Sequence, residues 1–190
     1  MTAEPCGWNA YVTAVIWIEA PSGVVWVRPG PVTHTVGKYP DPEACVIYVM
    51  TAHNPGGRIA SDTANAEAEA RLAAELERRA VTWWPAAGGN LSWTHVELGA
   101  AVIGMDETDA LALGAEFGQD AIFVLTPVDR RVVGCTDKRV AATGWSTEQD
   151  AGAGDGRYPS QGSCVTCWQD PACPTNAAHG RSAHAQIRLT

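Results

Sequence analysis

The sequence predicts an α+β fold with a ferredoxin-like core, and three observations in the 190 residues lead to this expectation. Between residues 44 and 133, short runs of β-branched and apolar residues alternate with two segments of helical periodicity. Two apolar runs linked by turn residues precede this region, and the periodicity fails after Cys135. The predicted order is β-α-β-β-α-β with one further strand, which is typical of the split β-α-β, ferredoxin-like arrangement.

The first 40 residues are expected to form a β-hairpin. Residues 11–18 are rich in β-branched and aromatic side chains, and residues 24–27 form a second run of the same kind. Pro21, Ser22 and Gly23 between them are turn residues. A third short strand is expected at residues 32–36.

The ferredoxin-like core is expected to begin with a buried strand at residues 45–51, where the chain is continuously apolar. A helix follows over about residues 62–80, with Ser61 or Asp62 as its N-cap. Small and apolar residues recur there every four positions: Ala64, Ala68, Leu72, Leu76 and Ala80. This spacing predicts a helix packed closely on a sheet.

Two strands, a second helix and two more strands complete the predicted core. The strands are expected at residues 81–84 and 92–103, with a turn at residues 87–90 between them. Asp106 is the expected N-cap of the second helix, and Gly118 marks its end. The last strands are expected at residues 121–125 and 131–133.

The expected organisation is a single domain at residues 1–135, made of the hairpin (1–40) and the core (41–135). Residues 136–190 are expected to form an irregular tail that contains Cys and His, because Gly, Ser, Asp and Gln dominate residues 144–163.

The charge of the chain narrows the classes of partner. Thirteen basic and 21 acidic residues give a formal net charge of −8, which opposes non-specific binding to nucleic acids and to anionic membrane surfaces. No uncharged stretch reaches 18 residues, and no basic start precedes an apolar run. We therefore expect a cytoplasmic protein that does not cross a membrane.

Five spaced motifs occur in order in the middle of the chain. They are Thr51-Ala-His-Asn-Pro55, Ser61 with Asn65, Trp84-Pro-Ala86-x-Gly88, Trp93 with Glu97, and Phe117-Gly-Gln119-x-Ala-Ile-Phe123. Over residues 45–126 this pattern resembles an uncharacterised bacterial family, a domain of unknown function. The resemblance implies one compact domain and no particular chemistry.

Polar residues of these motifs form a candidate site for a small molecule or an anion. Glu97 stands in an otherwise apolar strand, where a carboxylate needs a partner. The segment from residue 53 to 61 leads into the N-terminus of a helix, where free amides attract anions. The candidate ligand-binding residues are Asn54, Arg58, Ser61, Asn65, Glu97 and Gln119. The alternative is an internal hydrogen-bond network without a ligand.

The C-terminal residues contain a candidate structural zinc site. Cys164 and Cys167 form a C-x-x-C pair, and Cys173 and His179 follow at intervals of six residues. His184 is the alternative fourth ligand. A disulfide between Cys173 and one of the other two cysteines, or unligated thiols, are the remaining possibilities.

Two other functions belong to different classes. A protein-interaction or inhibitory module would use an acidic surface with exposed tryptophans, among Trp8, Trp17, Trp26, Trp145 and Trp168. A zinc-dependent nucleobase deaminase would use His95, Cys164 and Cys167 as ligands and Glu97 as proton shuttle. The long interval between His95 and Cys164, and Ser163 in place of proline, count against the deaminase.

Overall fold

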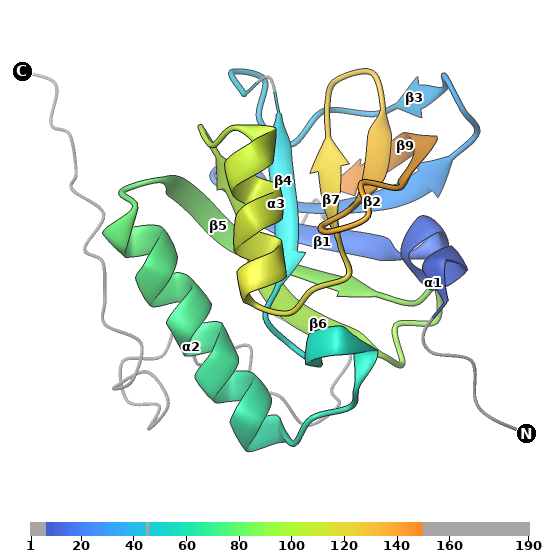
Figure 1. Cartoon of the computed structure of the whole chain (residues 1–190). Coiled ribbons are helices and arrows are strands. Elements are labelled where there is room, and N and C mark those ends of the chain that lie inside the picture. Colours follow the sequence, from blue (N-terminus) through green and yellow to red (C-terminus); the bar gives the residue numbers. More distant parts are fainter. Residues whose placement is uncertain (1–6, 45, 150–190) are drawn as a thin grey trace, which may run out of the picture.

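The computed structural model describes residues 7–44 and 46–149, and its nine strands form one sheet that closes into a barrel (Figure 1). The strands are β1 (Val15–Ala20), β2 (Gly23–Gly30), β3 (Thr35–Val36), β4 (Ile47–Thr51), β5 (Thr82–Gly89), β6 (Val96–Ile103), β7 (Ala121–Leu125), β8 (Arg130–Gly134) and β9 (Val140–Gln149). Their order is β2-β1-β5-β6-β4-β7-β8-β9, and β9 pairs back to β2. All these pairings are antiparallel, and β3 adds to β9 in parallel.

The predicted ferredoxin-like α+β fold is wrong. A ferredoxin-like sheet is open, whereas this one is closed, and more of the described residues lie in strands than in helices. The elements from β4 to β8 follow one another in the expected order, but the flanking segments are not appendages. The hairpin β1–β2 extends the sheet beside β5, β8 and β9 extend it beside β7, and β2 then pairs with β9. Two open edges are thereby joined, which removes every unpaired edge of the eight strands.

The strand β9 lies where the sequence predicted an irregular tail. Residues 144–149 of this strand pair with residues 25–30 of β2. Gly144 is a site of close backbone approach, because a Cβ atom there would collide with the carbonyl oxygens of Pro31 and His34. The glycine that indicated a loop in the sequence is therefore a requirement of the strand pairing.

The barrel has a filled interior and a separate core outside its wall. Ile16, Ile18, Val25, Val27, Ile47, Val49, Ala101, Leu125 and Trp145 belong to the inner cluster. Side chains on the other face of β4, β6 and β7 pack against two helices, α2 (Asp62–Arg78) and α3 (Glu107–Glu116). This alternation is the period-two pattern of strands.

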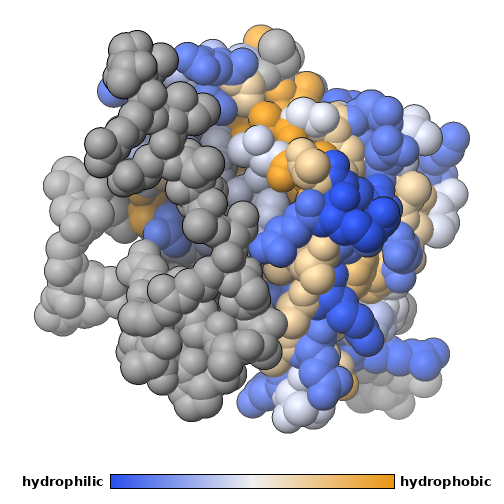
Figure 2. Space-filling view, turned by 90° about the vertical axis from the view of Figure 1, so that its left-hand side faces the viewer, coloured by the Kyte–Doolittle hydropathy of each residue, from blue (hydrophilic) through white to orange (hydrophobic). Residues whose placement is uncertain are grey.

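The two long helices lie side by side on one side of the barrel, and the short helix α1 (Trp8–Thr13) lies on the opposite side (Figure 1). Figure 2 views the side on which α2 lies, where mainly hydrophilic residues alternate with small hydrophobic areas outside the grey atoms. Among the residues that the structure describes, each helix is too short or too polar to cross a bilayer.

The first predicted helix is confirmed. It spans Asp62–Arg78, and Ser61 caps it by accepting a hydrogen bond from the Ala64 amide at 3.2 Å. Leu72 and Leu76 are buried against the sheet. Asp106 likewise caps α3, with its side chain accepting from the Asp109 amide.

Two element boundaries differ from the prediction, one near the N-terminus and one in the middle of the chain. Residues 8–13 form α1, so β1 begins only at Val15. Gly88 and Gly89 belong to β5 instead of a turn, and the connection to β6 runs through residues 90–95. Gly88 and Gly89 pair with Glu97 and Val96, so the absence of side chains does not end the strand.

A buried arginine fixes α1 to the barrel. The Arg130 side chain is fully buried, and its guanidinium donates to the carbonyl oxygens of Tyr11, Val12 and Ala14 at 2.9–3.0 Å. These are the carbonyls at the C-terminus of α1, where a cation is favourable. The guanidinium also lies 4.9 Å from the centre of the Phe123 ring. Burial lowers the pKa of Arg130 to about 10, so this residue remains charged at neutral pH.

Leu76→Ala should lower the free energy of unfolding by about 2–5 kcal/mol, because it leaves a cavity between α2 and the sheet. Urea denaturation measures the change. Glu77→Ala, on the exposed side of the same helix, is the control and should change stability by less than about 0.5 kcal/mol. Equal effects of the two substitutions would contradict the packing of α2.

Arg130→Met should destabilise the protein by at least about 2 kcal/mol, because three carbonyl groups lose their donor in a buried position. Arg28→Met is the control, since Arg28 is 40% exposed and makes one ion pair of 3.7 Å with Glu148. A loss below about 0.5 kcal/mol for Arg130→Met in urea denaturation would show that α1 is held by other contacts.

Candidate functional site

Glu97 lies at the end of the barrel where β6 begins and β4 and β5 end, which we call the mouth. It pairs with Gly88 of β5 and precedes Gly99, which pairs with Thr51 at the end of β4. Glu97 is on the same face of β6 as Ala101 and Ile103, whose side chains pack in the inner cluster. The carboxylate therefore starts from the inner face of the wall.

Asn54, which follows the end of β4, holds the Glu97 carboxylate. Asn54 Nδ2 donates to Glu97 Oε1 at 2.7 Å. The backbone of Asn54 is in the left-handed region (φ 50°), which asparagine tolerates better than most residues. This conformation ends the extended path of β4 and begins the short 3₁₀ helix η1 (Pro55–Gly57).

Asn65 of α2 locks Asn54 in place. Asn65 Oδ1 accepts from the Asn54 backbone amide at 2.9 Å, and Asn65 Nδ2 donates to Asn54 Oδ1 at 3.2 Å. The Ala60 amide also donates to Asn54 Oδ1, at 3.0 Å. Both the backbone and the side chain of Asn54 are thus fixed before any ligand arrives.

His95 completes this chain of contacts on the solvent side. His95 Nε2 lies 3.3 Å from Glu97 Oε1, and the side chains of His95 and Glu97 are 52% and 23% exposed. The resulting order is Asn65, Asn54, Glu97 and His95, from the helix to the surface. Such a series can orient an imidazole that accepts or donates a proton.

A second histidine–glutamate pair lies behind Asn54. His53 Nε2 is 3.4 Å from Glu69 Oε2, and both side chains are 10% exposed. Gln119 Nε2 donates to the His53 carbonyl oxygen at 2.8 Å, which ties the loop after α3 to the end of β4. Thr51 Oγ1 accepts from the His53 amide and donates to the Leu98 carbonyl.

The structure therefore brings together four of the six candidate ligand-binding residues. Asn54, Asn65 and Glu97 are in direct contact, and Gln119 binds the backbone of the neighbouring residue His53. Ser61 is instead occupied as the cap of α2. Arg58 is exposed in the connection between η1 and α2.

His53 and Glu69 were not predicted as site residues. Glu69 stands among alanines in α2 and is four residues after Asn65, so the helical period places these two side chains on one face. His53 immediately precedes Asn54. The same spacing that identified the buried face of α2 could have identified Glu69.

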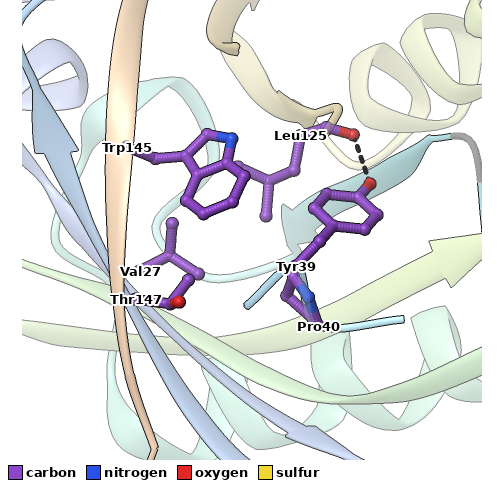
Figure 3. A pocket seen from close by; sticks show the side chains of 6 residues that line it. All are labelled: Val27, Tyr39, Pro40, Leu125, Trp145 and Thr147. Carbon is purple, nitrogen blue, oxygen red and sulfur yellow. Dashed lines mark hydrogen bonds between the residues drawn. The ribbon is translucent and has the colours of Figure 1, made fainter. Parts of the chain in front are cut away.

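A hollow at the other end of these strands is apolar and differs from the polar mouth (Figure 3). It is lined by Val27, Tyr39, Pro40, Leu125, Trp145 and Thr147. The Tyr39 hydroxyl donates a hydrogen bond to the Leu125 carbonyl at 2.8 Å. The hollow leaves no space for a water molecule. Leu125 is the last residue of β7 and lies opposite Ile47, the first residue of β4.

Within residues 7–44 and 46–149, no three His, Cys, Asp or Glu side chains are grouped so that they could hold a metal ion. The predicted zinc ligands Cys164, Cys167, Cys173 and His179, and the alternative His184, lie outside the described residues. The deaminase hypothesis depends on two of these cysteines and stays a prediction.

Comparison with protein families gave a match in the middle of the chain. Residues 50–122 match the model of a family described as "Protein of unknown function (DUF3293)". This segment is similar to that uncharacterised domain family. The resemblance inferred from the spaced motifs is thereby confirmed. No curated protein and no solved structure matched the chain.

The DUF3293 segment contains the whole network at the mouth. It runs from β4 into β7 and includes both long helices, so Asn54, Asn65, Glu97 and Gln119 all belong to it. Arg130 and β9 lie outside it. The family match therefore covers the candidate site and only part of the barrel that carries it.

The zinc prediction is tested by elemental analysis of protein purified without a chelator. About one zinc ion per chain is expected, with three cysteines and one histidine as its ligands. Replacing Cys164 and Cys167 with serine should abolish the signal, whereas replacing Cys135, which directly follows β8 within the described fold, should not. A content below about 0.2 zinc per chain would contradict the prediction.

Proposed function

We propose that this domain binds a small polar molecule at the mouth of the barrel, through Glu97 with Asn54 and His95. One observation carries the proposal: Glu97 is on the inner face of the barrel wall and has a neutral amide and a histidine as partners instead of Arg or Lys. A carboxylate held in this way keeps acceptor capacity for a ligand.

The side chains of this network are held in fixed positions, which favours a binding site over an ordinary polar surface. Asn54 is held by three hydrogen bonds from or to Asn65 and Ala60 before it donates to Glu97. Sites whose side chains are positioned by a second layer of hydrogen bonds lose less entropy when a ligand binds. The mouth of a barrel is also a common place for small-molecule sites.

The charges at the mouth favour a ligand that donates hydrogen bonds over an anion. Glu97 contacts Asn54 and Glu69 contacts the neighbouring His53, whereas Arg58 is exposed and one N-terminal amide of α2, that of Ala64, donates to Ser61. The anion-binding alternative thus has less support than it had from the sequence. We assign no reaction to the site.

The tryptophans give little support to the protein-interaction alternative. Trp17 and Trp145 are 7% and 4% exposed, and Trp145 Nε1 donates to the Thr126 carbonyl. Trp8 is partly buried and lies under the Arg139 guanidinium, 4.3 Å from ring centre to cation. Trp168 lies outside the described residues.

Glu97→Gln tests the proposal. Native mass spectrometry of the purified wild-type protein should detect a bound small molecule, or a thermal-shift screen of metabolites should find one that raises the melting temperature. Glu97→Gln should weaken that binding by at least about tenfold, equivalent to about 1.4 kcal/mol, because an acceptor oxygen is replaced by a donor.

The control is Glu67→Gln, which removes the same charge from an exposed position of α2. It should leave binding unchanged. Glu97→Ala should lower stability by about 1–3 kcal/mol, since Asn54 loses its acceptor. If Glu97→Gln and Glu67→Gln bind the ligand equally, the network at the mouth is structural only.

A further inference from the structure

A third apolar cluster lies on the outer face of the barrel wall, where β2, β1, β5 and β6 run side by side. The strand register places four of its side chains in one row: Trp26 lies opposite Trp17, Trp17 opposite Ala87, and Ala87 opposite Leu98. Because the residues that precede Trp17, Trp26 and Ala87 all belong to the inner cluster, this row faces outwards. We call the surface the tryptophan face, and it also includes Val15, Val24, Trp93 and Val96.

The described helices do not cover the tryptophan face. The helices α2 and α3 pack against β4, β6 and β7 in a different cluster, and no helix within residues 7–44 and 46–149 contributes a side chain to the tryptophan face. Trp17 and Trp93 are buried in it, whereas Val24 and Trp26 are only partly buried. An apolar patch of this kind on a barrel wall indicates a surface that another segment or molecule covers.

Trp93 lacks an acceptor for its indole N–H group. Its ring lies over Gly89, where a Cβ atom would be 2.8 Å from the ring, and it meets the Trp26 ring edge-on with the centroids 4.7 Å apart. The Nε1 atom is shielded from solvent and has no hydrogen-bond partner among the described residues. Because a buried indole N–H ordinarily has an acceptor, this group calls for a carbonyl from a covering segment.

The chain leaves the described structure at the edge of the tryptophan face. Glu148 of β9 lies opposite Trp26, and Gln149 lies opposite Val25. Adjacent strands are about 4.8 Å apart, so the distance across the face from β2 to β6 is about 15 Å. An extended chain spans about 3.3 Å per residue. Residues 150–168 are therefore long enough to cross the whole face.

The composition of residues 150–190 fits a segment that gains from an existing apolar surface. From Cys164 to the last residue its large apolar side chains are too few for a core of their own: Val165, Trp168, Ile187 and Leu189. Its three aspartates are balanced by three arginines, so the segment has no net charge that the acidic barrel would repel. The covalent link also gives it a millimolar effective concentration, which favours it over a separate partner.

We propose that residues 150–190 dock on the tryptophan face, with Trp168 as the main apolar anchor and a backbone carbonyl of the segment as the acceptor for the Trp93 indole. Trp168 is the largest apolar side chain of this segment. Docking covers the outer side of β1, β2 and β5, as α2 and α3 cover that of β4, β6 and β7. The proposal is independent of the ligand site at the mouth and of zinc binding.

Photo-crosslinking in the full chain tests which segment covers the face. The substitution Val24→p-benzoylphenylalanine places a crosslinker on the face, and Glu67→p-benzoylphenylalanine, at an exposed position of α2, is the control. Mass spectrometry of the monomer band should find position 24 linked to residues 150–190, with a yield at least fivefold above that from position 67. Links between two chains, no link to residues 150–190, or equal yields from the two positions would overturn the proposal.

Hydrogen exchange of the tryptophan indoles, followed by NMR, tests the anchor. Trp168→Ala should speed exchange of the Trp93 indole at least tenfold and leave Trp145 unchanged, because the Trp145 indole donates to the Thr126 carbonyl. Trp8→Ala removes a tryptophan from α1 and should change neither rate. Unchanged exchange of Trp93 in Trp168→Ala would overturn the anchor. If Trp145 also exchanges faster in that variant, the fold is disturbed and the crosslinks decide alone.

Discussion

The pairing of β2 with β9 is the interaction on which the rest of the structure depends. It joins residues 25–30 to residues 144–149 and turns an open sheet into a barrel. Closure creates an inner face, and eight strands enclose a space that side chains can fill. Ile16, Val25, Ile47 and Trp145 fill it here. Closure also defines the mouth, where the inner face of β6 brings Glu97 to the end of the barrel wall.

The closed barrel places two charged side chains, those of Arg130 and Glu97, in different environments. Arg130 is buried at the start of β8, where its donors satisfy the C-terminal carbonyls of α1. Glu97 stands at the start of β6, where its charge is only partly shielded. The Arg130 guanidinium holds α1 in place, whereas the Glu97 carboxylate can still accept hydrogen bonds from a ligand.

Local elements could be predicted from the sequence because their signals are local. The cap at Ser61 and the four-residue spacing of Ala68, Leu72 and Leu76 belong to α2 alone. The continuous apolar run at residues 121–125 likewise matches β7. Closure could not be predicted in the same way, since β9 is rich in small and polar residues. Gly144 resembles a loop residue until the backbone of Pro31 and His34 is placed against it.

Part of the candidate site was predictable for a different reason. Glu97 is conspicuous in an apolar strand, and Asn54, Asn65 and Gln119 belong to motifs of the DUF3293 segment. His53 and Glu69 were missed because a single histidine after a strand and a glutamate on an alanine-rich helix are ordinary in sequence. Their partnership depends on how α2 lies against the end of β4, and that is a tertiary contact.

The claim that the barrel closes, and so places Glu97 at a mouth, is tested most directly by nuclear Overhauser contacts between β2 and β9 in the full chain labelled with ¹³C and ¹⁵N. The account predicts cross-strand contacts between Val27 and Thr147 and between Val25 and Gln149, with slow exchange of the amides in this pairing. Contacts from β2 to β1 alone, with fast exchange along the other edge of β2, would show an open sheet and contradict the account.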